Sequence, residues 1–186
     1  MKNEKLKIKG FTMIELLIVI AVLGVLAVAV LSAINPLEQI NRGRDTGLRS
    51  DSEQILSAID RFYTAQQYYP WQITVNNPAD DKVDWQALPD AKDGNNVLVL
   101  DKLSQTGTEE IKKSFADRLK KPEYKLFIYK KSGTENSTYV CFSPRSASFQ
   151  TEAANRCAGT KPLDWPASAC NNTTDCGTKG NCICLP

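Results

Sequence analysis

The most constraining feature of this chain is a long apolar run at residues 16–34, which directly follows Glu15. The run holds no charged residue. At about 1.5 Å per residue it would span roughly 28 Å as a helix, close to the hydrocarbon thickness of a bilayer. A carboxylate in such a helix costs roughly 2.5–3.5 kcal/mol at its centre and less near an interface. Glu15 is therefore a candidate functional residue, because a cost of this kind usually marks a partner.

The residues before the run do not form an ordinary secretory signal. Residues 1–10 contain four lysines and one glutamate, and no small-residue cleavage site followed by a loop ends the apolar run. The positive-inside rule places this end in the cytoplasm. Hydropathy alone favours an uncleaved signal anchor. That interpretation leaves Glu15 and the junction of Gly10, Phe11 and Thr12 unexplained.

The pattern Gly10-Phe11-Thr12-x-x-Glu15-Leu16-Leu17 after a short basic leader resembles the processing motif of type IV prepilins and type II secretion pseudopilins. The resemblance covers residues 5–69. It implies that a prepilin peptidase cleaves after Gly10 and that the new amine of Phe11 is N-methylated. It also implies that Glu15 faces the N-terminal amine of a neighbouring subunit in a filament. Such a pair is physically reasonable, because either charge alone in a dry core would be strongly disfavoured.

The resemblance and the pattern together predict an α+β, pilin-like fold with a long N-terminal helix packed on a small antiparallel sheet. The expected divisions are a cleaved leader at 1–10, a transmembrane or filament-core half of the helix at 11–35, and an amphipathic half at 36–69. A globular domain follows at 70–186, and its tail at 141–186 is Cys-rich. Pro36 is expected to end or kink the membrane helix, and Gly43 and Gly47 weaken helix formation after it. Residues 35–47 are then either a segment that loses helical order on assembly or a simple hinge.

The second half of the helix has one apolar stripe, which needs a sheet or other helices to cover it. Its members are Leu48, Ile55, Leu56, Ile59, Phe62 and Tyr63. Residues 72–96 read as a connecting loop and residues 97–100 as a strand. Residues 108–120 read as a short helix capped by Thr108, and residues 124–129 and 138–142 as a hairpin.

All six cysteines lie in the last third of the chain, beyond the apolar run, and this favours disulfides formed in an oxidising compartment. They are Cys141, Cys157, Cys170, Cys176, Cys182 and Cys184. Fifteen pairings are open, and a metal site in the last four is the weaker alternative. The tail at 158–186 is poor in large apolar residues, so crosslinks would have to hold its shape.

The charge balance gives little evidence for a nucleic-acid partner. The chain has 23 basic and 21 acidic residues, and the leader holds four of the basic residues and one of the acidic residues. Residues 11–186 therefore carry a formal net charge of −1. Three lysine pairs, at 112–113, 120–121 and 130–131, could form a patch for DNA, although a solvated face explains them better.

Neither a cofactor nor catalysis is expected. Calcium could bind the acidic loop at 80–96, as it does in some pseudopilins, but the spacing matches no defined calcium loop. The oxygen donors there are Asp80, Asp81, Asp84, Asp90, Asp93, Asn95 and Asn96. The chain has no histidine, which excludes His-based triads, and it carries no P-loop, dinucleotide or zinc-protease motif.

The expected function is a structural subunit of a type IV pilus-like filament that serves adhesion, motility or DNA uptake. Its expected partners are copies of itself, related pilins, the prepilin peptidase and an inner-membrane assembly platform. The protein would cross the inner membrane once before entering an extracellular pilus or periplasmic pseudopilus. The alternatives are a pseudopilin of type II secretion or competence, and a monomeric membrane-anchored binding protein.

Overall fold

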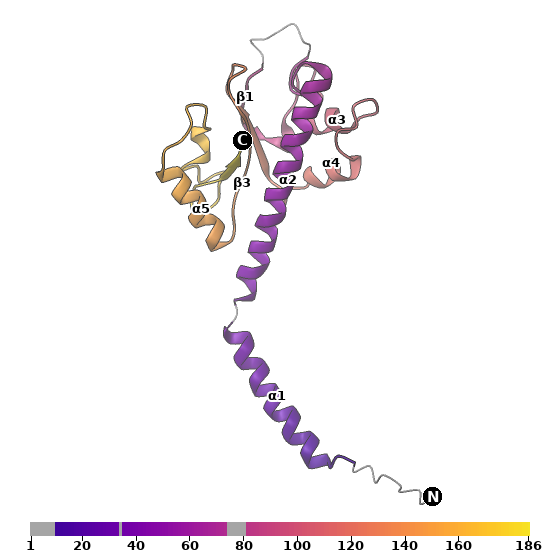
Figure 1. The fold of residues 1–186 in the computed structure, drawn as a ribbon, viewed down its shortest axis with the longest axis vertical. Helices are drawn as coiled ribbons and strands as arrows, with labels where there is room; N and C mark the ends of the chain where they lie inside the picture. Colours follow the sequence, from indigo (N-terminus) through magenta and orange to yellow (C-terminus); the bar gives the residue numbers. More distant parts are fainter. Residues whose placement is uncertain (1–9, 34, 74–80) are drawn as a thin grey trace, which may run out of the picture. The chain divides into compact units, whose positions relative to one another are not determined.

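A computed structural model describes residues 10–33, 35–73 and 81–186 of the chain (Figure 1). The chain forms two compact units, Met1–Gln39 and Ile40–Pro186. In the first unit, α1 (Met13–Ala33) is apolar apart from Glu15 in its first turn and Ser32 near its end. Its window Met13–Ser32 is long and apolar enough to cross a membrane, and none of that window is buried within the chain. An apolar helix with no buried face needs another apolar environment to cover it.

The helix α2 (Pro36–Gln66) begins at the proline that was expected to interrupt the helix. The side chain of Asn35 accepts a hydrogen bond from the backbone N–H of Glu38 at 3.3 Å. An Asn cap followed by Pro at the first helical position is a favourable helix start. The helix continues through Gly43 and Gly47, and a Cβ added at either glycine would meet no atom within 4 Å.

The predicted apolar stripe of α2 is buried except at Tyr63, which is partly buried. Leu48, Ile55, Ile59 and Phe62 are at most 1% exposed and form the main core. Burial of such a side chain contributes roughly 1.5–3 kcal/mol, so this stripe is a major source of the domain's stability.

A four-stranded antiparallel sheet with the order β1-β2-β3-β4 covers the stripe. Its strands are β1 (Val83–Ala87), β2 (Leu126–Lys130), β3 (Thr138–Phe142) and β4 (Ile183–Leu185). Alternation along β2 and β3 places Leu126, Ile128 and Val140 in the core with α2. Phe127 and Tyr139 point to the other face, where they pack against the cysteines of the tail. The predicted α+β fold with a small antiparallel sheet is therefore confirmed.

Three segments differ from the prediction. Residues 72–96 are not a loop throughout, because they contain β1, which pairs with the distant β2, and the short helix η2 (Leu88–Asp90). Residues 97–100 do not form a strand, because Val99 opens the helix α3 (Val99–Ser104), which buries Val99, Leu100 and Leu103. Short apolar runs do not distinguish a strand from a buried helix. The predicted helix at 108–120 is shorter, α4 (Lys113–Leu119), with Lys112 at its N-cap position. The hydroxyl of Thr108 instead donates to the carbonyl of Lys102 at 2.7 Å.

The remaining elements are η2 (Leu88–Asp90), α5 (Ala147–Ala158) and η3 (Ala167–Ala169). Within the second unit, α5 and the tail lie on one side of α2, while α3 and α4 lie on the other (Figure 1). The domain thus presents two different edges, one on each side of the long helix.

Candidate functional site

The residues of the N-terminal motif lie at the start of α1. The backbone N–H and the hydroxyl of Thr12 donate to one carboxylate oxygen of Glu15, at 2.8 Å and 2.7 Å. The N–H of Glu15 donates back to the Thr12 hydroxyl oxygen at 3.3 Å. This reciprocal arrangement is a capping box, in which Thr12 is the N-cap and Glu15 the third helical residue. Gly10 and Phe11 precede the cap and are exposed. Glu15 therefore already has an intramolecular role, which sequence reasoning had not considered.

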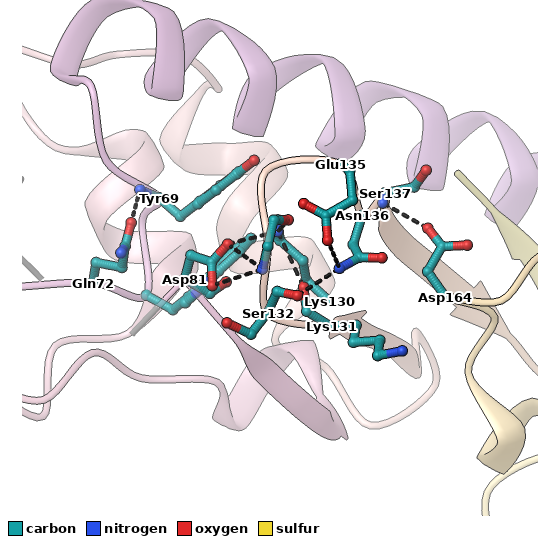
Figure 2. Close-up of polar contacts among 12 residues, drawn as sticks. Tyr69, Gln72, Asp81, Lys130, Lys131, Ser132, Glu135, Asn136, Ser137 and Asp164 are labelled. Atoms are coloured by element: carbon teal, nitrogen blue, oxygen red, sulfur yellow. Dashed lines mark hydrogen bonds and ion pairs between the residues drawn. The ribbon is translucent and has the colours of Figure 1, made fainter. Parts of the chain in front are cut away.

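The second polar centre of the chain surrounds Lys130, at the end of β2 (Figure 2). Alternation along β2 points Lys130 inward, and it is 0% exposed. Its ammonium group donates to Asp81 at 3.0 Å and to the carbonyl of Gly133 at 2.8 Å, and it lies 5.1 Å from the ring of Tyr69. The backbone N–H of Gly133 also donates to Asp81, at 3.0 Å. Lys130 thus joins the loop after α2 to the β2–β3 turn and cannot belong to a surface patch.

A similar buried pair lies beside α3. The ammonium group of Lys102 donates to Asp93 at 2.8 Å and to the carbonyl of Gln72 at 2.6 Å. The ring of Tyr68 lies 5.4 Å from this ammonium. The neighbouring tyrosines Tyr68 and Tyr69, which follow α2, therefore each accompany one buried Lys–Asp pair.

These pairs shift the pKa values of the carboxyl groups. Burial acts to raise the pKa of Asp81, but hydrogen bonds from Lys130 and from the backbone N–H of Gly133 outweigh it, so the pKa lies below its ordinary value. Burial also acts to raise the pKa of Asp93. Hydrogen bonds from Lys102 and from the N–H groups of Val97 and Asn95 outweigh it, so the pKa of Asp93 lies below its ordinary value. Burial, followed by the negative groups around it, raises the pKa of Tyr69 to about 12.

Two of the oxygen donors named for calcium in the acidic loop are engaged by lysines in the structure. Calcium takes six to eight oxygen ligands, whereas Asp81 and Asp93 each hold an ammonium group. Among the described residues, no group of three or more His, Cys, Asp or Glu side chains is placed to hold a metal. Asp80 lies outside the described residues.

In the two other lysine pairs, at 112–113 and 120–121, one lysine of each pair forms an ion pair with an aspartate. Lys113 contacts Asp117 at 3.4 Å, and Lys120 forms ion pairs with Asp101 and Asp117. These contacts reduce the free positive charge that a DNA-binding face would need.

All six cysteines form disulfides, and together these organise the tail. Cys141 and Cys184 lie directly opposite each other on β3 and β4. Cys157 at the end of α5 pairs with Cys170, and Cys176 pairs with Cys182. The disulfides thus attach the tail to the outer face of the sheet and close its two smaller loops.

The comparisons with known proteins agree with the N-terminal geometry. A family model described as the prokaryotic N-terminal methylation motif matches residues 5–31. This is the prepilin-type motif of type IV pilins and pseudopilins, and it supports a protein of that kind, a structural subunit rather than an enzyme. Together with α1, it fits a membrane-anchored protein that becomes extracellular or periplasmic. Comparisons with curated proteins and with solved structures found no match.

Sequence reasoning missed two buried carboxylates that organise the domain. Asp45 of α2 accepts hydrogen bonds from the N–H groups of Arg145 and Ser146, at 2.9 Å and 2.7 Å. Asp164 accepts from the N–H of Ser137 at 2.7 Å (Figure 2) and from the hydroxyl of Tyr139 at 3.0 Å. Their partners lie 25 to 101 residues away in the chain, so no local pattern marks either residue.

Proposed function

We propose that this protein is a structural subunit of a type IV pilus-like filament. The observation that carries the proposal is the methylation motif at residues 5–31 on an apolar helix with no buried face in its own chain. The same helix can lie in a bilayer before assembly and in a filament core afterwards, because both environments are apolar. A disulfide-stabilised domain follows it, as suits a protein exposed outside the cytoplasm.

The proposed maturation begins on the cytoplasmic side of the inner membrane. A prepilin peptidase cleaves after Gly10, and the amine of Phe11 becomes N-methylated. The lysine-rich leader keeps this end in the cytoplasm until it is removed. An inner-membrane assembly platform then moves the subunit into an extracellular pilus.

Glu15 has two successive partners in this proposal. In the free subunit, its carboxylate accepts hydrogen bonds from Thr12. In the filament, the carboxylate also faces the Phe11 amine of a neighbouring copy. A carboxylate oxygen can accept more than one hydrogen bond, so the capping box and the intersubunit pair are compatible.

Paired substitutions separate these two roles of Glu15. Thr12→Ala removes the hydroxyl of the cap and keeps the carboxylate, whereas Glu15→Leu removes the carboxylate. We expect Glu15→Leu to remain in the membrane and to be absent from sheared filaments, while Thr12→Ala still assembles. Quantitative immunoblots of membrane and filament fractions measure both. Normal filament incorporation of Glu15→Leu contradicts the proposed pairing, and equal loss in both variants reduces Glu15 to a helix cap.

The same motif also occurs in pseudopilins, so a short periplasmic filament for secretion or competence is the second candidate. Immunogold electron microscopy distinguishes the two, because only a pilus carries the label far beyond the cell surface. A monomeric anchored binding protein would give label on the membrane and no filament in either compartment.

A further inference from the structure

A small cavity in the second unit brings together three cationic side chains from segments that are far apart in the sequence. Its volume is about 220 Å³. Arg44 comes from α2, Lys125 directly precedes β2, and Arg145 lies between β3 and α5. Like charges repel each other, so placing them around one cavity costs free energy unless an anion offsets the repulsion.

The protein itself offsets this positive charge only in part. The side chains of Lys125 and Arg145 are exposed and form no ion pair or hydrogen bond among the described residues. The Nη1 atom of Arg44 lies 3.5 Å from Asp45, whose carboxylate is largely taken by hydrogen bonds from the start of α5. That nitrogen is buried and has no hydrogen-bond partner in the described chain. Burial, and then the charge of Arg145, hold the pKa of Arg44 below its ordinary value.

Two carboxylates also line the cavity, but neither forms an ion pair with these cations in the part of the chain that the structure describes. The carboxylate of Asp175 accepts hydrogen bonds from the indole N–H of Trp85 at 3.0 Å and from the side-chain amide of Asn172 at 3.1 Å. Glu123 is exposed, and it is its backbone carbonyl that accepts from Arg44, at 3.3 Å. The cations around the cavity therefore remain available to an external anion.

The neutral lining of the cavity adds hydrogen-bond donors. Ser143, directly after β3, and Thr174, in the tail, both line it, and neither hydroxyl forms a hydrogen bond within the described residues. Gly177 lies beside Ser143 with a φ of +71°, and a Cβ there would be only 2.9 Å from the Ser143 Oγ. Glycine at this position thus leaves the hydroxyl uncrowded. Charged donors and hydroxyls together suit an oxyanion whose oxygens each accept several hydrogen bonds.

We propose that this cavity binds a phosphate group. Arginine and lysine form charge-assisted hydrogen bonds with phosphate oxygens, and the planar fork of arginine suits their geometry. Phosphate oxygens point in several directions, so donors from separate segments of the chain can each reach one. Two sources can present this group to the domain: free phosphate in the surroundings, and the headgroup of an anionic phospholipid in the membrane that holds α1. The inference does not depend on filament assembly, so it can fail while the proposed function stands.

The first test measures binding of inorganic phosphate by the full chain in an uncharged detergent. Tryptophan fluorescence follows the thermal unfolding midpoint, with phosphate compared against chloride at equal ionic strength. Phosphate also stabilises proteins by exclusion from their surface, so the double variant Lys125→Gln, Arg145→Gln supplies the background. We expect a larger phosphate-dependent rise of the midpoint in the unaltered chain, and about tenfold weaker phosphate binding by the double variant.

Lys131→Gln is the matched control, because Lys131 is exposed and lies outside the cavity. It should keep the phosphate response of the unaltered chain. In chloride, the control and the double variant should both unfold at the midpoint of the unaltered chain, because all of the replaced side chains are exposed. An equal loss of the phosphate response in Lys131→Gln would reveal a general effect of net charge and would overturn the inference.

The second test separates the two sources of the phosphate group. Native mass spectrometry identifies the lipid that the full chain retains after release from micelles with equal amounts of phosphatidylglycerol and phosphatidylcholine. A preference for phosphatidylglycerol that the double variant loses assigns the headgroup as a source. A phosphate response without that preference assigns free phosphate. The inference is overturned if the unaltered chain shows neither response, or if the double variant keeps every response that the unaltered chain shows.

Discussion

The carboxylate of Asp45 in α2 accepts hydrogen bonds from both the backbone N–H and the hydroxyl of Ser146, at 2.7 Å and 2.8 Å. Ser146 is the N-cap residue of α5, and Asp45 is 0% exposed. A negative group at this end of a helix is favourable because the first N–H groups have no partner within the helix. Asp45 therefore fastens α5 to the long helix.

Replacing Asp45 with alanine should destabilise the domain by about 3 kcal/mol, because it leaves buried N–H groups of Arg145 and Ser146 without an acceptor. Chemical denaturation followed by tryptophan fluorescence measures this change. Asp60→Ala is the matched control on an exposed position of the same helix, and it should change stability by less than about 0.5 kcal/mol. Equal effects of the two substitutions would contradict the assigned role of Asp45.

The buried pair of Asp81 and Lys130 should behave as a coupled unit. Asp81→Asn leaves the buried ammonium group without its counter-charge and should destabilise the domain by about 3–5 kcal/mol. Asp81→Asn combined with Lys130→Met should destabilise it by less than the sum of the single effects. A double-mutant cycle in denaturant measures the coupling. Strictly additive effects would mean that the pair contributes no interaction of its own.

Acid should weaken the domain through its buried carboxylates. The pKa values of Asp81, Asp93 and Asp164 lie below the ordinary value of 3.8 in the folded protein. Their contribution to stability is therefore present above about pH 4 and is lost as the pH falls through the folded pKa values.

Asp51 acts in the opposite direction. Burial raises its pKa despite the nearby Arg118, so protonation of Asp51 favours the folded state. Three carboxyl groups have a lowered pKa in the folded protein and one has a raised pKa. We therefore expect a net loss of stability below about pH 4. Denaturation midpoints measured between pH 7 and pH 3 test this, and the Asp81→Asn, Lys130→Met double variant should show a shallower pH dependence. A midpoint that rises on acidification would contradict the assigned shifts.

The disulfides should contribute unequally. The Cys141–Cys184 disulfide joins residues 43 positions apart, whereas Cys176–Cys182 joins residues six apart. Loop-closure entropy then predicts that replacing the first pair by alanines costs about 4 kcal/mol and the second about 2 kcal/mol. Unfolding of the two double variants under non-reducing conditions measures the difference. A larger loss from the Cys176–Cys182 pair would show that loop length does not dominate the effect.

The parts of the fold that sequence predicts well are those encoded by local periodicity. The stripe through Leu48, Ile55 and Phe62 repeats at helical spacing and is buried as expected. The hairpin of β2 and β3 follows from alternating residues on either side of a turn. Gly10, Phe11 and Glu15 also stand in a short contiguous motif, which the family model matches.

The missed features depend on partners that are distant in the chain. Lys130 and Lys131 form one basic pair in the sequence, but strand alternation buries Lys130 against Asp81 and leaves Lys131 exposed. The helix α5 was not predicted, because its apolar residues are few and its start is held by Asp45. Leu163 is exposed because its neighbours Asp164 and Trp165 form contacts with Ser137, Tyr139 and Pro162. No local sequence pattern predicts this exposure.

The most direct test of processing and assembly into a filament is the N-terminal mass of the protein from purified filaments and from membranes. Tandem mass spectrometry of the N-terminal peptide identifies both the cleavage position and the modification. We expect N-methylated Phe11 as the first residue in filaments, with Met1 as the start only in the unprocessed membrane pool. An N-terminus at Met1 in both fractions would contradict cleavage after Gly10 and, with it, the proposed route of the helix from membrane to filament.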